Sequence, residues 1–273
     1  MRTVLAAVLA ASALAGCDTY HYLAGTMHED ARRPVKALAH YEAFLSRRPK
    51  DPRACEVRLR AGELYRRVFA RCGEARAHYE AAARDFPSQR ACVDRAKAAL
   101  LLCPDYFPTD GGRTWVYVDS ASGGKAMRLE WEARASTSGL VGTSGTVLSA
   151  LFAGNKRIQQ KSERYEKADW AVWRVDAEGR EAILRYPYAE MQTWTAKRAK
   201  TSVEYLIVSS SAAVQTAAGA FTGCLKVRET DRAFKRSWKY DYYCPGVGRV
   251  KTTIGGPGFE NPNTELKQFG KIE

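Results

Sequence analysis

Histidine is confined to the beginning of this chain, and the motifs of common catalytic sites are missing from all of it. The four histidines lie before residue 80, so the rest of the sequence has no histidine to act as a general base or metal ligand. No Gly-Lys phosphate loop, Gly-x-Ser-x-Gly elbow, His-Glu-x-x-His helix or Cys-x-x-Cys pair occurs. His21 and His28 could share a helical face, but without a third ligand nearby we expect them at the surface. The sequence predicts a protein that is not an enzyme and holds no metal or other cofactor.

Long hydrophobic runs are also scarce, and the clearest one lies at the N-terminus. Val4 to Leu14 is apolar and follows the positive charge of Arg2, but it is shorter than the about 20 residues that a membrane-spanning helix needs. A charged start followed by a short apolar run is typical of a signal peptide. We therefore assign residues 1–16 to an export signal.

The end of this signal, Leu14-Ala15-Gly16-Cys17, resembles the bacterial lipobox, in which a branched apolar residue and two small residues precede an obligatory cysteine. The resemblance implies cleavage between Gly16 and Cys17, a diacylglyceryl group on the Cys17 thiol, and acylation of the new amine. Several acyl chains hold a protein stably on a membrane. We expect a lipoprotein anchored in the cell envelope and facing the periplasm, on either the inner or the outer membrane. An ordinary secretory signal with a coincidental cysteine is the alternative.

The net charge of +13 is spread along the sequence, without a basic block that carries interleaved aromatic residues. This distribution argues against nucleic acid as a partner, which an exported protein would in any case rarely meet. It would allow contact with anionic lipids at the membrane surface. A solvated basic surface is the simpler interpretation.

Composition changes near residue 104. All six tryptophans lie after residue 110, and the segment 103–112 is punctuated by Pro and Gly, as is typical of a junction. Before this segment, runs rich in Ala, Arg, Leu and Glu show no strand alternation and indicate helices. We therefore expect an α+β protein with a helical domain at residues 17–103 and a β domain at residues 104–273.

A pattern of four positions recurs in the helical part after 38 residues. Its small, aromatic, apolar and proline positions keep the same offsets in both copies: Ala37, Tyr41, Phe44 and Pro49, then Ala75, Tyr79, Ala82 and Pro87. The pattern resembles the second helix of a tetratricopeptide repeat, whose usual period is about 34 residues. The resemblance implies about two and a half such repeats, with a concave face that binds a protein partner. A plain bundle of helical hairpins is the alternative.

The part that follows residue 104 shows the alternation of antiparallel β-strands. Apolar and charged side chains alternate in Met127–Glu132, and aromatic and polar side chains alternate in Ser237–Tyr242. Short connections between such runs favour antiparallel pairing. The segment from Ser136 to Gly145 is rich in Ser, Gly and Thr, and we expect a loop there.

Two segments of this part resemble signatures of uncharacterised bacterial envelope proteins. They are Tyr106-Phe107-Pro108 leading to Trp115-Val116-Tyr117, and Gly223–Val227 followed by Tyr242–Lys251. The resemblance implies a curved antiparallel sheet akin to the half-barrels of periplasmic lipoprotein carriers. The many aromatic side chains of such a sheet could hold a hydrophobic ligand or could simply fill the core.

Six cysteines follow Cys17, and an even number in an exported chain indicates disulfides. Two cysteines on paired strands of a hairpin would face each other. In a repeat array, cysteines at equivalent ends of successive helices would also come together. We predict three pairs, Cys55–Cys92, Cys72–Cys103 and Cys224–Cys244, with free buried thiols as the alternative.

Together these patterns predict a non-catalytic, lipid-anchored envelope protein that binds a protein partner through its helical repeats, with a β domain that displays them. The alternative function is a carrier or sensor that holds a hydrophobic ligand or a lipid in the curved sheet.

Overall fold

The computed structural model describes residues 19–139, 142–177, 179–198, 201–234 and 236–271. The expected signal peptide and the expected lipid site at Gly16 and Cys17 lie outside these described residues. The chain divides into two compact units, the first ending at Cys103 and the second running from Pro104 to Glu273.

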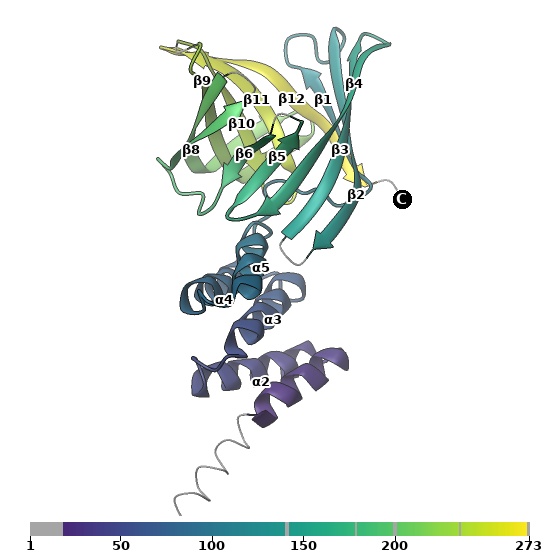
Figure 1. Ribbon diagram of the computed structural model, residues 1–273. Helices are drawn as coiled ribbons and strands as arrows, with labels where there is room; N and C mark the ends of the chain where they lie inside the picture. Colours follow the sequence, from purple (N-terminus) through teal and green to yellow (C-terminus); the bar gives the residue numbers. More distant parts are fainter. Residues whose placement is uncertain (1–18, 140–141, 178, 199–200, 235, 272–273) are drawn as a thin grey trace, which may run out of the picture. The chain divides into compact units, whose positions relative to one another are not determined.

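The first unit consists of short helices that each pack on the next along the chain. Residues 19–30 are helical, and four further helices follow: α2 (Pro34–Arg47), α3 (Ala54–Arg67), α4 (Cys72–Asp85) and α5 (Arg90–Leu100) (Figure 1). No helix among the described residues has both the length and the apolar character needed to cross a membrane.

Close contact between a glycine and a tyrosine ring joins successive helices in this unit. Tyr41 in α2 and Tyr79 in α4 are fully buried. A Cβ atom added to Gly25 would lie 2.5 Å from the ring of Tyr41, and one added to Gly62 in α3 would lie 2.4 Å from the ring of Tyr79. Only a residue without a side chain allows these rings to lie so close to the neighbouring helix.

The predicted fold class, tetratricopeptide-like repeats followed by a β domain, is wrong. The described helices are five short segments, and they make fewer than the about three stacked helix pairs that a solenoid needs to bury its faces. Most of the described chain is a β-sheet instead. The recurring pattern around Tyr41 and Tyr79 records a local contact between an aromatic ring and a glycine, which a helical hairpin can make without belonging to a repeat array.

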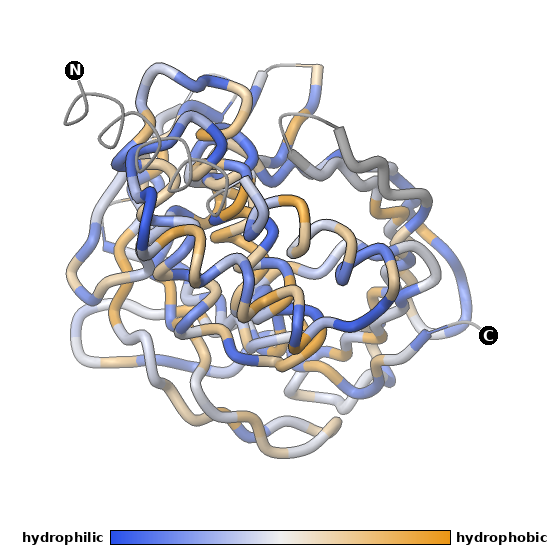
Figure 2. The backbone as a smooth tube through the Cα atoms, turned by 90° about the horizontal axis from the view of Figure 1, so that it is seen from below, coloured by the Kyte–Doolittle hydropathy of each residue, from blue (hydrophilic) through white to orange (hydrophobic). Residues whose placement is uncertain are grey.

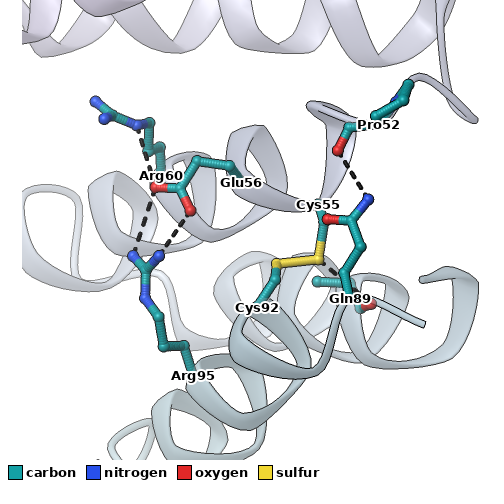
Figure 3. The surroundings of a disulfide bond; sticks show 8 residues. Pro52, Cys55, Glu56, Arg60, Gln89, Cys92 and Arg95 are labelled. Atoms are coloured by element: carbon teal, nitrogen blue, oxygen red, sulfur yellow. Dashed lines mark hydrogen bonds and ion pairs between the residues drawn. A yellow bond between two sulfur atoms is a disulfide. The ribbon is translucent and has the colours of Figure 1, made fainter. Parts of the chain in front are cut away.

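Two disulfides fasten the helical unit. Cys55 in α3 is bonded to Cys92 in α5, and Cys72 at the start of α4 is bonded to Cys103. Polar contacts surround the first of them: Arg95 pairs with Glu56 at 2.7 Å, and the side chain of Gln89 donates a hydrogen bond to the carbonyl of Pro52 at 2.9 Å (Figure 3). Such cross-links stabilise small cores mainly by restricting the unfolded chain, by about 2–4 kcal/mol each.

The second unit is one antiparallel sheet, which within the described residues contains twelve strands. They are β1 (Arg113–Asp119), β2 (Met127–Gly139), β3 (Gly142–Ala153), β4 (Lys156–Ala168), β5 (Ala171–Asp176), β6 (Gly179–Arg185), β7 (Thr193–Arg198), β8 (Thr201–Thr216), β9 (Gly219–Asp231), β10 (Trp238–Cys244), β11 (Gly248–Gly256) and β12 (Phe259–Lys271). The order in the sheet is β6-β5-β4-β3-β2-β1-β12-β11-β10-β9-β8-β7.

This order makes two series of hairpins that meet where β1 pairs with β12. The sheet curls so strongly that its two edge strands, β6 and β7, come together as well (Figure 1). Side chains close this seam, and the indole Nε1 of Trp194 on β7 donates a hydrogen bond to the carbonyl of Ala182 on β6 at 2.7 Å. The implied curved sheet is therefore confirmed, as a nearly closed half-barrel. Within the segment expected to be a loop, residues 136–139 of β2 instead pair with residues 142–145 of β3.

An apolar core occupies one part of the half-barrel interior. Trp115 and Tyr117 of β1 pack there with Leu266 of β12 and with the disulfide between Cys224 and Cys244. Hydrophobic and hydrophilic stretches are interspersed along the backbone tube (Figure 2).

The glycine contact in the helical unit can be tested by adding one methyl group. Gly62→Ala should destabilise the unit by about 1–3 kcal/mol, because the new Cβ overlaps the buried ring of Tyr79. The matched control is Gly73→Ala in α4, where nothing lies within 4 Å of the added Cβ and where alanine favours the helix. Hydrogen exchange measured on peptides that precede Cys103 reports this unit alone, and equal protection in the two variants would contradict the packing described.

Candidate functional site

The interior of the half-barrel contains a cavity of about 210 Å³ next to the apolar core. Its wall carries charged, aromatic and aliphatic side chains together. The lining residues are Phe107, Leu129, Trp131, Ser149, Lys161, Glu163, Tyr165, Arg174, Ile183, Arg198, Tyr205, Glu229, Lys239, Asp241, Tyr243 and Arg249. Five of these side chains are basic and three are acidic, so the wall carries an excess of positive charge.

One acidic side chain on an edge strand joins the two ends of the sheet. Glu181 of β6 forms an ion pair with Arg174 of β5, its neighbour in the sheet. On the other side of the seam, Glu181 accepts a hydrogen bond from Arg198 of β7 at 2.5 Å and one from the hydroxyl of Tyr205 of β8 at 2.6 Å. The side chain of Glu181 is only 6% exposed. The edge strands β6 and β7 are not joined by backbone hydrogen bonds. The side-chain contacts of Glu181 therefore hold these two edges together.

The ion pairs continue from the seam around the wall. Arg198 also pairs with Glu229 of β9 at 2.6 Å, and Glu229 pairs with Lys239 of β10 at 2.9 Å. Lys239 in turn pairs with Asp241 at 2.9 Å. In this chain each charge has an oppositely charged neighbour, which is the condition under which charged groups tolerate burial.

The acidic members of the chain are held in their charged form. Burial would raise the pKa of Asp241, but the ammonium of Lys239 and the guanidinium of Arg249 outweigh it and lower that pKa. For Glu229, burial is likewise outweighed by Lys239 and Arg198, and its pKa is lowered. Both side chains are therefore carboxylates at neutral pH, and they offer the cavity acceptors rather than proton donors.

Arg249 differs from the other basic residues of the wall. Its guanidinium carbon lies 4.4 Å from the centre of the Trp131 ring and 5.1 Å from that of Tyr117, which are cation–π distances. Its Nε atom is buried and has no hydrogen-bond partner in the part of the chain that the structure describes. Arg249 also forms no ion pair with any described carboxylate, since Asp241 acts on it only as a more distant charge.

The charge of Arg249 persists despite its surroundings. Burial acts to lower the pKa of this guanidinium, but the combined electrostatic effect of Asp241, Tyr117, Tyr243 and Tyr165 outweighs burial and raises it. The two aromatic rings contact the guanidinium, and its buried Nε–H group has no hydrogen-bond partner among the described residues. The site can thus accept an anionic group, because an arginine fork binds a carboxylate or phosphate in bidentate fashion.

An apolar wall accompanies the charges. Leu129 and Trp131 of β2 and Ile183 of β6 line the same cavity as Arg249. The indole Nε1 of Trp131 is buried and has no hydrogen-bond partner among the described residues. The cavity therefore combines apolar surface with two unused types of donor, the indole of Trp131 and the guanidinium of Arg249.

The residues singled out from the sequence lie elsewhere. All three expected cysteine pairs are bonded in the structure, but they brace the two units and do not line the cavity. His21, His28 and His40 lie together in the helical unit and are half-buried rather than exposed. Among the described residues, no group of three or more histidine, cysteine, aspartate and glutamate side chains is arranged to hold a metal ion.

Sequence reasoning missed the charged wall and Arg249. Arg249 belongs to the segment Tyr242–Lys251 that carries the resemblance to envelope proteins, but the segment by itself shows only a hairpin with a Pro-Gly turn. The signal that could have found the wall is the spacing of Lys239 and Asp241, two opposite charges on one face of a strand.

Neither a protein-family model nor a curated protein matches the sequence. Among solved structures, one from Bacteroides fragilis carries the provisional description of an exported protein with a YmcC-like fold. It is 14% identical, covers 62% of this chain and 100% of its own, and superimposes with a TM-score of 0.49. A second, from Parabacteroides distasonis, is provisionally described as a lipoprotein; it is 16% identical, covers 60% of this chain and 98% of its own, and has a TM-score of 0.43. Neither description states a ligand or an activity.

The ion-pair chain can be tested by neutralising one member. Glu229→Gln should destabilise the β unit by about 3–5 kcal/mol, because it leaves Lys239 and Arg198 without their shared carboxylate in the interior. Glu132→Gln is the matched control, since its pair with Arg134 is exposed and contributes at most about 0.5 kcal/mol. Denaturant unfolding followed by tryptophan fluorescence measures the β unit, which holds all six tryptophans. Similar losses in both variants would argue against a buried chain.

The lowered pKa values of Asp241 and Glu229 also predict how stability depends on pH. A carboxyl group whose pKa is lower in the folded state stabilises the fold above its unfolded value of about 4, and this contribution is lost as the pH falls through the lower folded value. The fluorescence midpoint of the β unit should therefore fall steeply below about pH 4. Asp241→Asn should lower the midpoint at neutral pH and make the acid fall shallower. An unchanged acid slope would show that Asp241 is not charged in the folded protein.

Proposed function

We propose that the β unit binds a compact ligand with an anionic group inside its curved sheet, and that the protein is a carrier or sensor of this ligand rather than an enzyme. The observation that carries the proposal is Arg249, a charged guanidinium that lines the cavity, stacks on two rings and has no carboxylate partner among the described residues. Arg249 is half-buried. A partly desolvated cation without a paired carboxylate is costly, and an anionic ligand lowers that cost.

The rest of the wall favours an anion over a neutral or cationic ligand. The acidic side chains that line the cavity are already paired with Lys161, Arg174, Arg198 and Lys239. The one basic group left over is Arg249. A cation entering the cavity would therefore find no free carboxylate, whereas an anion finds a free arginine fork.

The apolar side chains of the wall define the remainder of the ligand. Leu129, Trp131 and Ile183 offer a surface for a short apolar group beside the anion. A purely hydrophobic ligand fits poorly, because it would exclude water from charged side chains without replacing its hydrogen bonds. In place of the hydrophobic ligand expected from the sequence, we therefore propose a ligand that is apolar at one end and anionic at the other.

The proposal keeps the expected place of the protein in the cell. A lipid on Cys17 would hold this ligand-binding unit in the envelope, facing the periplasm. The protein partner that was expected on tetratricopeptide-like repeats is not part of the proposal, because the repeats are absent from the described structure.

Binding of simple amphiphilic anions tests the proposal. Hexanoate should bind the protein, measured by calorimetry, while hexanamide, its uncharged analogue, should bind at least about tenfold more weakly, since charged hydrogen bonds contribute about 1.5–3 kcal/mol. Arg249→Met should abolish this preference while keeping an unbranched apolar stem. Arg157→Met, at an exposed position of β4, should leave hexanoate binding unchanged. Equal binding of the acid and the amide, or no binding of hexanoate, would overturn the proposal.

A further inference from the structure

The helix at residues 19–30 presents an apolar stripe that stays largely exposed in its own unit, although the ring of Tyr20 meets the ring of His40 in α2 edge-on. Tyr20, Leu23 and Met27 are 60%, 58% and 61% exposed. The other side of the same helix is buried: Ala24 is 4% exposed, and Gly25 contacts the ring of Tyr41 in α2. The helix is therefore apolar on two faces, of which only one packs against the protein.

The spacing makes the three exposed residues a single surface. Positions separated by three and four residues lie above one another on a helix, so Tyr20, Leu23 and Met27 form one continuous row. The row is about 10 Å long, since a helix rises about 1.5 Å per residue. Scattered apolar residues are common on protein surfaces, but an aligned row on one helix is typical of a contact surface.

The position of the row in the chain indicates what covers it. Cys17, the expected lipid-bearing residue, precedes Tyr20 by three residues, a span of at most about 11 Å. An acyl anchor at Cys17 would therefore keep the row within reach of the membrane interface. No segment of protein is long enough between Cys17 and Tyr20 to carry the row away from it.

The chemistry of the neighbouring residues fits the same surface. Tyrosine prefers the headgroup level of a membrane, where its ring is apolar and its hydroxyl is wet. Arg32, Arg33 and Lys36 follow the helix and are exposed, whereas between residues 19 and 36, the described part of this region, Asp30 is the one exposed acidic residue. Basic side chains at this depth are attracted by anionic lipids.

We propose that the row of Tyr20, Leu23 and Met27 lies in the membrane interface beside the lipid of Cys17, as an interfacial helix that docks the helical unit on the bilayer. The inference rests on the proposed lipid anchor and is independent of ligand binding at Arg249. The lipid then provides attachment, while the apolar row fixes which side of the helix faces the membrane.

Vesicle binding of the unlipidated chain tests the row by itself. Residues 17–273 with Cys17→Ser should cosediment with vesicles of phosphatidylethanolamine and phosphatidylglycerol. The triple variant Tyr20→Ser, Leu23→Ser and Met27→Ser should bind these vesicles at least tenfold more weakly. The matched control changes three residues of similar exposure in the β unit, Ile158→Ser, Met191→Ser and Phe259→Ser, and should bind as the parent does.

A second measurement shows that the variant has lost a contact and not its fold. Hydrogen exchange of residues 19–30 should slow when vesicles are added to the parent, and it should be equal in the parent and the triple variant without vesicles. The proposal is overturned if the parent does not bind vesicles, if the triple variant binds as tightly as the control, or if the triple variant instead abolishes self-association of the parent. Hexanoate binding, measured in water without vesicles, stays unaffected by the triple variant and so separates this proposal from the previous one.

Discussion

The ionic contacts of Glu181 with Arg174 and Arg198 are the constraint on which the β unit depends. The two edge strands of the sheet meet without a backbone ladder, so side chains must hold them together. Because Glu181 is almost completely buried, its charge requires partners on both sides of the seam. Each partner brings a further charge inside, and the chain of pairs therefore extends from the seam to Asp241 on β10. The polar interior is thus a consequence of how this sheet closes.

A polar interior has a functional consequence. The paired charges hold their side chains at fixed positions around a cavity. Arg249 lies beside this chain but outside its pairing, with its orientation set by Trp131 and Tyr117. A binding group that is already oriented loses little conformational entropy when a ligand arrives. The position of Arg249 beside the ion-pair chain therefore favours ligand binding more than it favours the stability of the fold.

Sequence reasoning succeeded where a local pattern decides the structure. Alternation identified β2 and β10, and cysteine spacing gave the three pairs that the structure forms. The prediction of tetratricopeptide-like repeats was wrong. The pattern behind it reflects local contacts such as that of Tyr79 with Gly62, which do not require a repeat array. On β10 it is the charged side chains that face the interior: Lys239 and Asp241 line the cavity, while the intervening Tyr240 does not. The spacing of the two charges places them on one face of the strand, but it does not show that this face is the buried one, since their burial depends on partners from β7 and β9 that only the closed sheet brings together.

The interior of the half-barrel presents the guanidinium of Arg249, which has no carboxylate partner among the described residues, to an incoming anion. The most direct test of this arrangement is a crystal structure of the protein grown in bromide, in which anomalous scattering locates each bound halide. We expect an anomalous peak inside the half-barrel, within hydrogen-bonding distance of the Arg249 guanidinium. Bromide bound only at surface lysines and arginines, with an empty interior beside Arg249, would contradict it.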